Sequence, residues 1–251
     1  MTMVQLAAWA VHFYTALGAV VGVLALDAVS RGAYGGAFVW LAIATWIDST
    51  DGTLARRVRV KEVLPNFDGA RLDDIVDYLN YVVVPVVLAH SAALLPQGQT
   101  GWLIAAFPLV ASGYGFCQTD AKTADHFFKG FPSYWNVVVF YLYVLRSPQW
   151  FNVAVLLILS VMVFVPIRYL YPSRTPTARH RTYALGLVWA VLLAVLLWQF
   201  PTPSRTLAIV SLFFPAYYFA ISFHLHFTLT GKNEPRRRGD HGGEHGAGYL
   251  R

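Results

Sequence analysis

The sequence contains a single cysteine, Cys117, and few charged residues. One cysteine excludes an internal disulfide bond. Charged residues make up only 13% of the 251 residues, whereas 57% are hydrophobic. This balance disfavours a soluble globular protein and is typical of a chain that crosses a membrane several times. The sequence also has no basic start followed by a small-residue cleavage site, so we expect the first apolar segment to remain as an uncleaved span.

Long hydrophobic runs are what the sequence does contain. A bilayer core requires about 20 apolar residues per helical span. Turn signals separate the runs, for example Pro65-Asn66 and Pro201-Thr202-Pro203. We therefore predict an all-α, polytopic transmembrane helix bundle of about eight spans. The predicted spans are 7–29, 33–55, 71–94, 99–118, 132–147, 151–171, 182–200 and 205–229.

The formal net charge of +6 is compatible with a nucleic-acid partner, but the placement of the cations has a simpler explanation. If the N-terminus is cytoplasmic, 16 of the 19 Lys and Arg residues fall on the cytoplasmic side and 3 on the other. This bias follows the positive-inside rule of membrane proteins. We therefore expect a multi-pass protein with both termini in the cytoplasm and without a nucleic-acid partner.

The end of the sequence differs in composition from the rest. Residues 232–251 are rich in Gly, Arg and His and have no apolar periodicity. Such a segment cannot bury enough apolar surface to fold, which predicts a disordered cytoplasmic tail. Residues 1–231 would then form one transmembrane domain.

Four aspartates flank the loop between the second and third predicted spans. Asp48 and Asp51 are three residues apart, and Asp73 and Asp77 are four apart. On helices these spacings place side chains on one face, so two adjacent helices could aim four carboxylates at one point near the cytoplasmic surface. One such aspartate would simply be an interfacial carboxylate paired with an arginine. Four together would repel one another unless cations were bound, which predicts a divalent-metal site.

The ligands of this predicted site are oxygen atoms only, because no Cys or His accompanies the aspartates. Oxygen ligands favour Mg²⁺, Mn²⁺ or Ca²⁺, and Mg²⁺ keeps open positions for phosphate oxygens. The site therefore indicates phosphoryl chemistry. Gly52 and Gly69 would let a bulky ligand approach the backbone, and Arg56 could meet a phosphate. Taken alone, the glycines would equally indicate close packing of helices.

Taken together, these residues resemble the signature of the CDP-alcohol phosphotransferase family, D-x2-D-G-x2-A-R followed by G-x3-D-x3-D. The resemblance implies a membrane enzyme that transfers a phosphatidyl or phosphoryl-alcohol group from a CDP-linked donor to an alcohol, with two Mg²⁺ or Mn²⁺ ions. The implied metal ligands are Asp48, Asp51, Asp73 and Asp77, and Asp77 is also the implied catalytic base. The implied CDP-binding residues are Gly52, Ala55, Arg56 and Gly69.

Two departures from the common family pattern narrow the resemblance. Twelve residues separate Arg56 from Gly69, and eight spans exceed the usual six. Both features resemble the bacterial phosphatidylcholine synthases, as do the stretches 61–81 and 121–136. That resemblance implies CDP-diacylglycerol and choline as substrates, phosphatidylcholine and CMP as products, a location in the bacterial inner membrane, and a homodimer.

Choline would require aromatic partners, because a quaternary ammonium has no N–H donor. Aromatic residues near the predicted site are also explained as anchors at the membrane interface. The residues that we single out as choline contacts are Tyr78, Tyr114, Trp135 and Asn136.

Two alternatives stay open at this point. The acceptor could instead be serine, glycerol phosphate or inositol phosphate, and the basic run Arg57, Arg59 and Lys61 keeps a phosphate-bearing acceptor in view. A cation transporter is the alternative from another class. Transport favours carboxylates spread across the bilayer depth, whereas these gather at one surface and are accompanied by glycines and an arginine.

Overall fold

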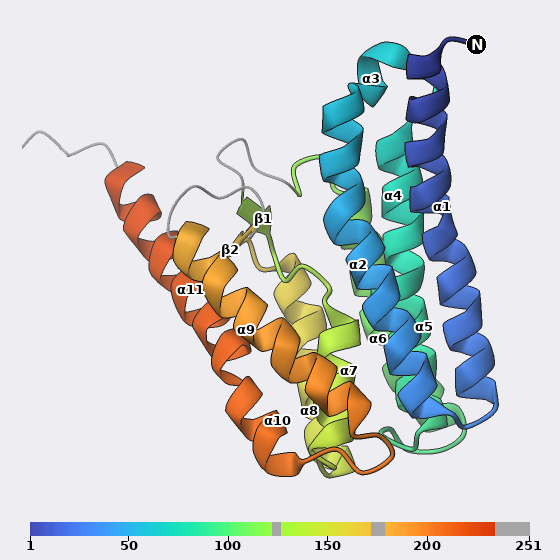
Figure 1. The fold of residues 1–251 in the computed structure, drawn as a ribbon. Coiled ribbons are helices and arrows are strands. Elements are labelled where there is room, and N and C mark those ends of the chain that lie inside the picture. Colours follow the sequence, from blue (N-terminus) through green and yellow to red (C-terminus); the bar gives the residue numbers. More distant parts are fainter. Residues whose placement is uncertain (122–126, 172–178, 234–251) are drawn as a thin grey trace, which may run out of the picture.

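Helices, most of them apolar, make up most of the described chain (Figure 1). The computed structural model describes residues 1–121, 127–171 and 179–233, and for residues 229–233 the backbone alone. The helices follow the order of the predicted spans, so the sequence correctly predicted a mostly helical protein.

The first two predicted spans form a helical hairpin. α1 (Met3–Ser30) begins with a capping box, in which the Thr2 hydroxyl accepts from the Gln5 amide and the Gln5 side chain accepts from the Thr2 amide. The chain turns at Gly32, where φ is 69°. Glycine adopts this left-handed conformation without steric cost. α2 (Tyr34–Val58) then packs along α1 and is followed by the short α3 (Val60–Val63).

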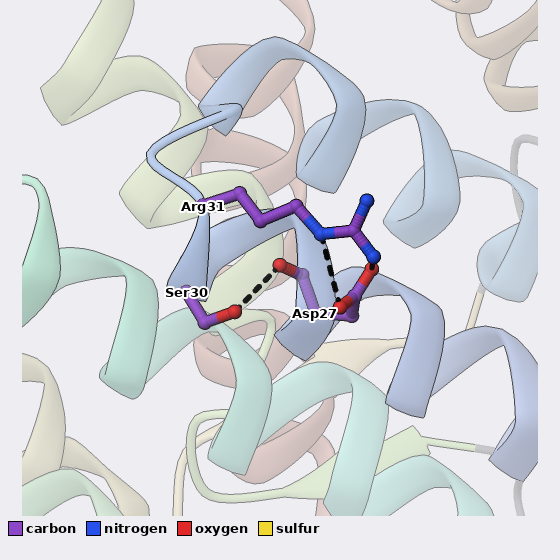
Figure 2. A network of polar contacts seen from close by, with 3 residues as sticks. All are labelled: Asp27, Ser30 and Arg31. Carbon is purple, nitrogen blue, oxygen red and sulfur yellow. Dashed lines mark hydrogen bonds and ion pairs between the residues drawn. The ribbon is translucent and has the colours of Figure 1, made fainter.

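The end of α1 carries a small polar network (Figure 2). Arg31 Nη2 forms an ion pair with Asp27 Oδ2 at 2.5 Å, and Arg31 Nε donates to Asp27 Oδ1 at 3.1 Å. The Ser30 hydroxyl donates to the Asp27 carbonyl at 2.8 Å. These contacts lie within one helix end, so we assign Asp27 a local role there.

The third predicted span is a continuous helical segment whose middle is a π-helix. α4 (Gly69–Asp77) is capped by the Asp68 side chain, which accepts from the Arg71 amide. The π-helix η1 (Tyr78–Val83) follows, and α5 (Val84–Ser91) continues the segment. Pro85 has no N–H to donate to the carbonyl of Tyr81, four residues earlier, and the wider π-turn immediately precedes it.

In the second half of the chain, the described residues form six further helices and two short strands. The helices are α6 (Gln99–Cys117), α7 (Trp135–Val144), α8 (Gln149–Phe164), α9 (Arg179–Trp198), α10 (Arg205–Ser211) and α11 (Phe213–Asn233). β1 (Phe127–Lys129) and β2 (Arg168–Leu170) pair antiparallel, with Phe127 opposite Leu170. In Figure 1 the strands lie toward the end of the bundle at which α1 begins.

The strands correct one part of the sequence prediction. A single helical span over 151–171 was expected, but α8 ends at Phe164. Pro166 follows two residues later, and proline disfavours helical backbone before it as well as continuation of the helix through it. The chain is then free to extend and pair as β2. The all-α prediction therefore holds apart from this small sheet.

Within the part of the chain that the structure describes, four segments are long and apolar enough to cross a membrane. They are Met3–Ser30, Gln99–Cys117, Arg179–Trp198 and Arg205–Thr228. Large apolar side chains on these segments face outward, for example Leu103, which is 69% exposed, and Trp198, which is 90% exposed. Surfaces of this kind are costly in water and suited to lipid. The chain is therefore a membrane protein.

The domain boundary predicted at residue 231 falls inside an element, because α11 continues to Asn233. The rest of the predicted tail, residues 234–251, lies outside the described residues, so the predicted disorder of the tail stays a prediction.

Close packing of α1 against the helical segment formed by α4, η1 and α5 depends on glycine. A Cβ atom added to Gly22 would lie 2.7 Å from Asn80 Oδ1 and 2.8 Å from Leu79 Cδ2. Asn80 cannot easily move, because its Nδ2 donates to the carbonyls of Gly18 and Val76, both at 3.0 Å. Gly22 thus lets α1 approach the aspartate-bearing helix closely, as small residues do between membrane helices.

We expect Gly22→Ala to reduce the free energy of unfolding by about 1–3 kcal/mol, the usual cost of overpacking. The thermal-unfolding midpoint of the purified protein in detergent measures this. Gly36→Ala in α2 is the matched control, since its Cβ would meet only Ala28 Cβ at 3.9 Å. Equal midpoints for the two variants would contradict the packing role of Gly22.

Candidate active site

Three of the four predicted aspartates converge. One carboxylate oxygen each from Asp48, Asp73 and Asp77 lies within 4.8 Å of the other two. Asp48 comes from α2, whereas Asp73 and Asp77 are one turn apart on α4 and so share a face. All three are partly buried. Three carboxylates at this spacing, without nitrogen or sulfur ligands, fit hard divalent cations such as Mg²⁺ and Mn²⁺.

Asp51 lies beside this group. Only 5% of Asp51 is exposed, and its Oδ2 accepts a hydrogen bond from the Thr15 hydroxyl at 2.8 Å. Its side chain also contacts that of Asp73. The four predicted ligands therefore form a group of three with Asp51 adjoining it through Asp73.

The larger of two neighbouring cavities has a volume of about 860 Å³ and contains the other motif residues. Gly52, Ala55, Arg56 and Gly69 line it together with Asp51 and Asp73. Arg59 and Lys61 add two further cationic side chains to the lining. This cavity therefore combines carboxylates, small residues and basic groups, a lining suited to a phosphorylated ligand that binds with a cation.

The smaller cavity, of about 400 Å³, is acidic and aromatic. Asp48, Asp74 and Asp77 contribute carboxylates to it. Its aromatic lining consists of Tyr81, Phe116, Phe128, Phe131, Tyr134 and Tyr171. Asp73, Ala70 and Tyr171 line both cavities, so the three-aspartate group lies where the two meet.

Lys129 is the only cationic residue among the described residues that line the smaller cavity. Its Nζ lies 2.6 Å from Asp120 Oδ2. The hydrogen bond from Lys129 lowers the pKa of Asp120 from its ordinary value, and Asp120 in turn raises the pKa of Lys129. Both groups are therefore charged at neutral pH, and the lysine charge is countered by its partner.

Three relatives of this chain share one name. A phosphatidylcholine synthase of Legionella pneumophila is 48% identical over 169 residues, which are 67% of this chain and 66% of that protein. The phosphatidylcholine synthase of Legionella bozemanae is 38% identical over 213 residues, which are 82% of this chain and 98% of that protein. That of Pseudomonas aeruginosa is 38% identical over 77% of this chain and 81% of the relative. No protein-family model matches the sequence.

The chain belongs to the phosphatidylcholine synthase family. Membership in the phosphatidylcholine synthase family confirms the predicted enzyme class, a transferase of phospholipid biosynthesis. The wider CDP-alcohol phosphotransferase resemblance stays a prediction from the motif.

None of the four residues predicted to contact choline is among the described residues that line the smaller cavity. The Tyr78 hydroxyl donates to the Leu109 carbonyl, and Tyr114 is 49% exposed. Trp135 is fully buried, with Nε1 donating to Ser112. Asn136 donates to Thr45. Of the other aromatic residues on this part of the chain, Phe128 and Tyr134 do line the cavity.

His12 is a site residue that the sequence did not single out. It lines the larger cavity, is only 6% exposed, and its Nε2 has no hydrogen-bond partner among the described residues. Its ring centroid lies 4.3 Å from that of Phe67. A Cβ atom on Gly69 would overlap His12 Cε1. A lone histidine on an apolar helix gives no signal of such a position.

Gly69 therefore has a packing role in addition to its predicted ligand role. We expect Gly69→Ala to lower the thermal-unfolding midpoint, because the new methyl group displaces the His12 ring. The loss should be much smaller in a His12→Ala background, where the ring is absent, and a double-mutant cycle measures this coupling. Gly113→Ala is the control, since its Cβ would come no closer than 3.9 Å to Tyr78. Additive losses at residues 12 and 69 would contradict this account.

Proposed function

We propose that this chain transfers the phosphatidyl group of CDP-diacylglycerol to choline and releases CMP. The observation that carries the proposal is the position of the three-aspartate group between two cavities of different chemistry. One cavity contains the motif residues and combines basic side chains with carboxylates, and the other is acidic and aromatic. Asp73 lines both, as a reaction between two substrates at one centre requires.

The larger cavity would hold the nucleotide part of the donor. Its volume of about 860 Å³ lies in the range of nucleotide and drug-sized ligand sites. Arg56 could pair with the pyrophosphate, and Arg59 and Lys61 would add to the positive potential. Gly52, Ala55 and Gly69 leave room for the ligand against the helices.

The smaller cavity would hold choline. Carboxylates such as Asp74 attract its positive charge, and aromatic faces bind quaternary ammonium groups. Phe128 and Tyr171 already form a pair with ring centroids 4.4 Å apart, and Tyr134 lines the same cavity. We assign the choline contacts to these three rings.

The lining charges also favour choline over an acceptor that carries a phosphate. The basic cluster of Arg56, Arg59 and Lys61 lines the larger cavity. In the smaller cavity Lys129 is paired with Asp120 and is outnumbered by carboxylates. A phosphate placed there would meet like charges, which costs several kcal/mol at close range.

Asp77 would act as the general base. It would accept the proton of the choline hydroxyl while the choline oxygen attacks the phosphorus that bears the diacylglycerol. The bond from that phosphorus to the CMP oxygen breaks, and CMP leaves. Asp48, Asp73 and Asp77, with Asp51 beside them, would hold Mn²⁺ or Mg²⁺. Two bound cations would supply neutralisation of the charge that develops on the leaving phosphate.

The proposed setting is a bacterial inner membrane crossed by about eight spans. In that arrangement the aspartates and both termini face the cytoplasm, where choline and CMP exchange. The positive-inside distribution of Lys and Arg supports this orientation. The acyl chains of the donor would stay in the bilayer beside the bundle. The homodimer expected from the family resemblance is part of the same proposal.

The decisive measurement is CMP release by the purified full-length protein in detergent with CDP-diacylglycerol and Mn²⁺. We expect release with choline and none with serine, glycerol 3-phosphate or inositol phosphate. Asp77→Asn should lower the rate at least ~100-fold, because a general base contributes that much or more. Asp27→Asn, at the end of α1 shown in Figure 2, should leave the rate unchanged.

Each outcome of this assay has a distinct meaning. Release with another acceptor would reject choline, and full activity of Asp77→Asn would reject the base. No release with any acceptor would reject the transferase reaction itself.

The aromatic cavity gives a separate prediction. We expect Tyr134→Leu to raise the KM for choline about tenfold, because one cation–π contact is lost, and to leave the KM for CDP-diacylglycerol unchanged. Tyr114→Leu is the matched control, since Tyr114 is 49% exposed and packs on Phe164. If Tyr114→Leu raises the KM for choline and Tyr134→Leu does not, choline contacts Tyr114, as predicted from the sequence, and not Tyr134.

A further inference from the structure

Tyr81 makes a direct hydrogen bond to the aspartate group. Its hydroxyl donates to Asp48 Oδ2 at 2.7 Å, and the residue is only 7% exposed. Tyr81 lies in the π-helix η1, one turn after Asp77. π-turns within helices are frequent at functional sites. The same helical segment therefore presents Asp73, Asp77 and a phenol that holds the remaining aspartate.

The Tyr81 hydroxyl has a second neighbour, Thr45, which in turn contacts Asn136. The Thr45 hydroxyl contacts Tyr81 and lies 2.9 Å from the Leu41 carbonyl, so its single proton can go to either oxygen. Asn136 Nδ2 donates to Thr45 Oγ1 at 3.1 Å. Thr45 lies on α2 three residues before Asp48, and Asn136 lies at the start of α7. Side chains from α2, η1 and α7 thus meet at one buried point.

This arrangement distinguishes Tyr81 from the other rings of the smaller cavity. A ring that only contacts a ligand makes no bond to a metal ligand, whereas the Tyr81 hydroxyl donates to Asp48. A hydrogen bond to one oxygen fixes the torsion of the whole carboxylate. Groups that orient metal ligands in this way change metal affinity by about 10–100-fold when they are removed.

We propose that Tyr81 is a positioning residue that holds the Asp48 carboxylate in the orientation that binds the divalent cation. The proposal rests on the proposed function, because it takes the three-aspartate group as the metal site. It also gives Asn136 a role: Asn136 supports the metal ligand through Thr45 and Tyr81 and does not contact the acceptor.

The test measures Mn²⁺ binding to the purified full-length protein in detergent without substrates. The signal of free Mn²⁺ in electron paramagnetic resonance is the readout. Tyr81→Phe keeps the ring and removes the donor, so the Kd for Mn²⁺ should rise at least about tenfold. The matched control is Tyr141→Phe. Tyr141 is equally buried, but its hydroxyl bonds to Ser211 and Trp189. We expect Tyr141→Phe to leave the Kd unchanged.

A second variant covers the possibility that Tyr81→Phe does not fold. Thr45→Val removes the support of the phenol and should raise the Kd by a smaller factor. In the double variant with Tyr81→Phe, Thr45→Val should not raise the Kd for Mn²⁺ further, because its effect passes through the Tyr81 hydroxyl. In the CMP-release assay, excess Mn²⁺ should restore the rate of Tyr81→Phe toward that of the wild type.

The outcomes separate this inference from the proposed function. If Tyr81→Phe binds Mn²⁺ with the wild-type Kd, the positioning role alone is overturned. If only Thr45→Val folds, the same result for that variant has the same meaning. A wild-type protein that binds no Mn²⁺ would overturn the metal site and the positioning role together. CMP release that persists without divalent cations would also reject both.

Discussion

Repulsion among carboxylates is the constraint on which the rest of this structure depends. Oxygens of Asp48, Asp73 and Asp77 lie within 4.8 Å of one another. At an effective dielectric constant of 20, each charged pair at such a distance costs about 3–4 kcal/mol. The fold must therefore hold α2 and α4 together against this repulsion, which the cations of the proposed function would relieve. Helix packing through α1, where Gly18 and Gly22 allow close contact, supplies part of that force.

Hydrogen bonds from single side chains also stabilise the aspartate group. Thr15 on α1 donates to Asp51, and Tyr81 on η1 donates to Asp48. Each donor stabilises a carboxylate that the low-polarity surroundings would otherwise penalise, and each fixes its direction. Asn80, next to Tyr81, joins η1 to the α1 backbone through Gly18. The polar groups of the site are thus hydrogen-bonded across three helices.

The sequence was sufficient to predict the parts of the site that follow from helical spacing. Asp73 and Asp77 share a face because they are four residues apart, and the motif residues around Gly52 and Arg56 line one cavity. It was not sufficient where distant segments decide the outcome. Trp135 turned into the core, His12 came to face Gly69, and the strands β1 and β2 formed after a proline ended α8. Apolar spacing alone carries no information on which aromatic ring lines a cavity and which packs in the core.

The division into two cavities explains why one carboxylate group can serve a reaction between substrates of opposite charge. A pyrophosphate donor requires cations around it, whereas choline requires anions and aromatic faces. A single shared pocket would place the arginines against the choline charge. Here Arg56, Arg59 and Lys61 line one cavity beside carboxylates such as Asp51, and Asp74, Phe128 and Tyr134 line the other. Asp73 lies in both linings, so in the proposed reaction the phosphorus and the attacking hydroxyl need to meet only at that boundary.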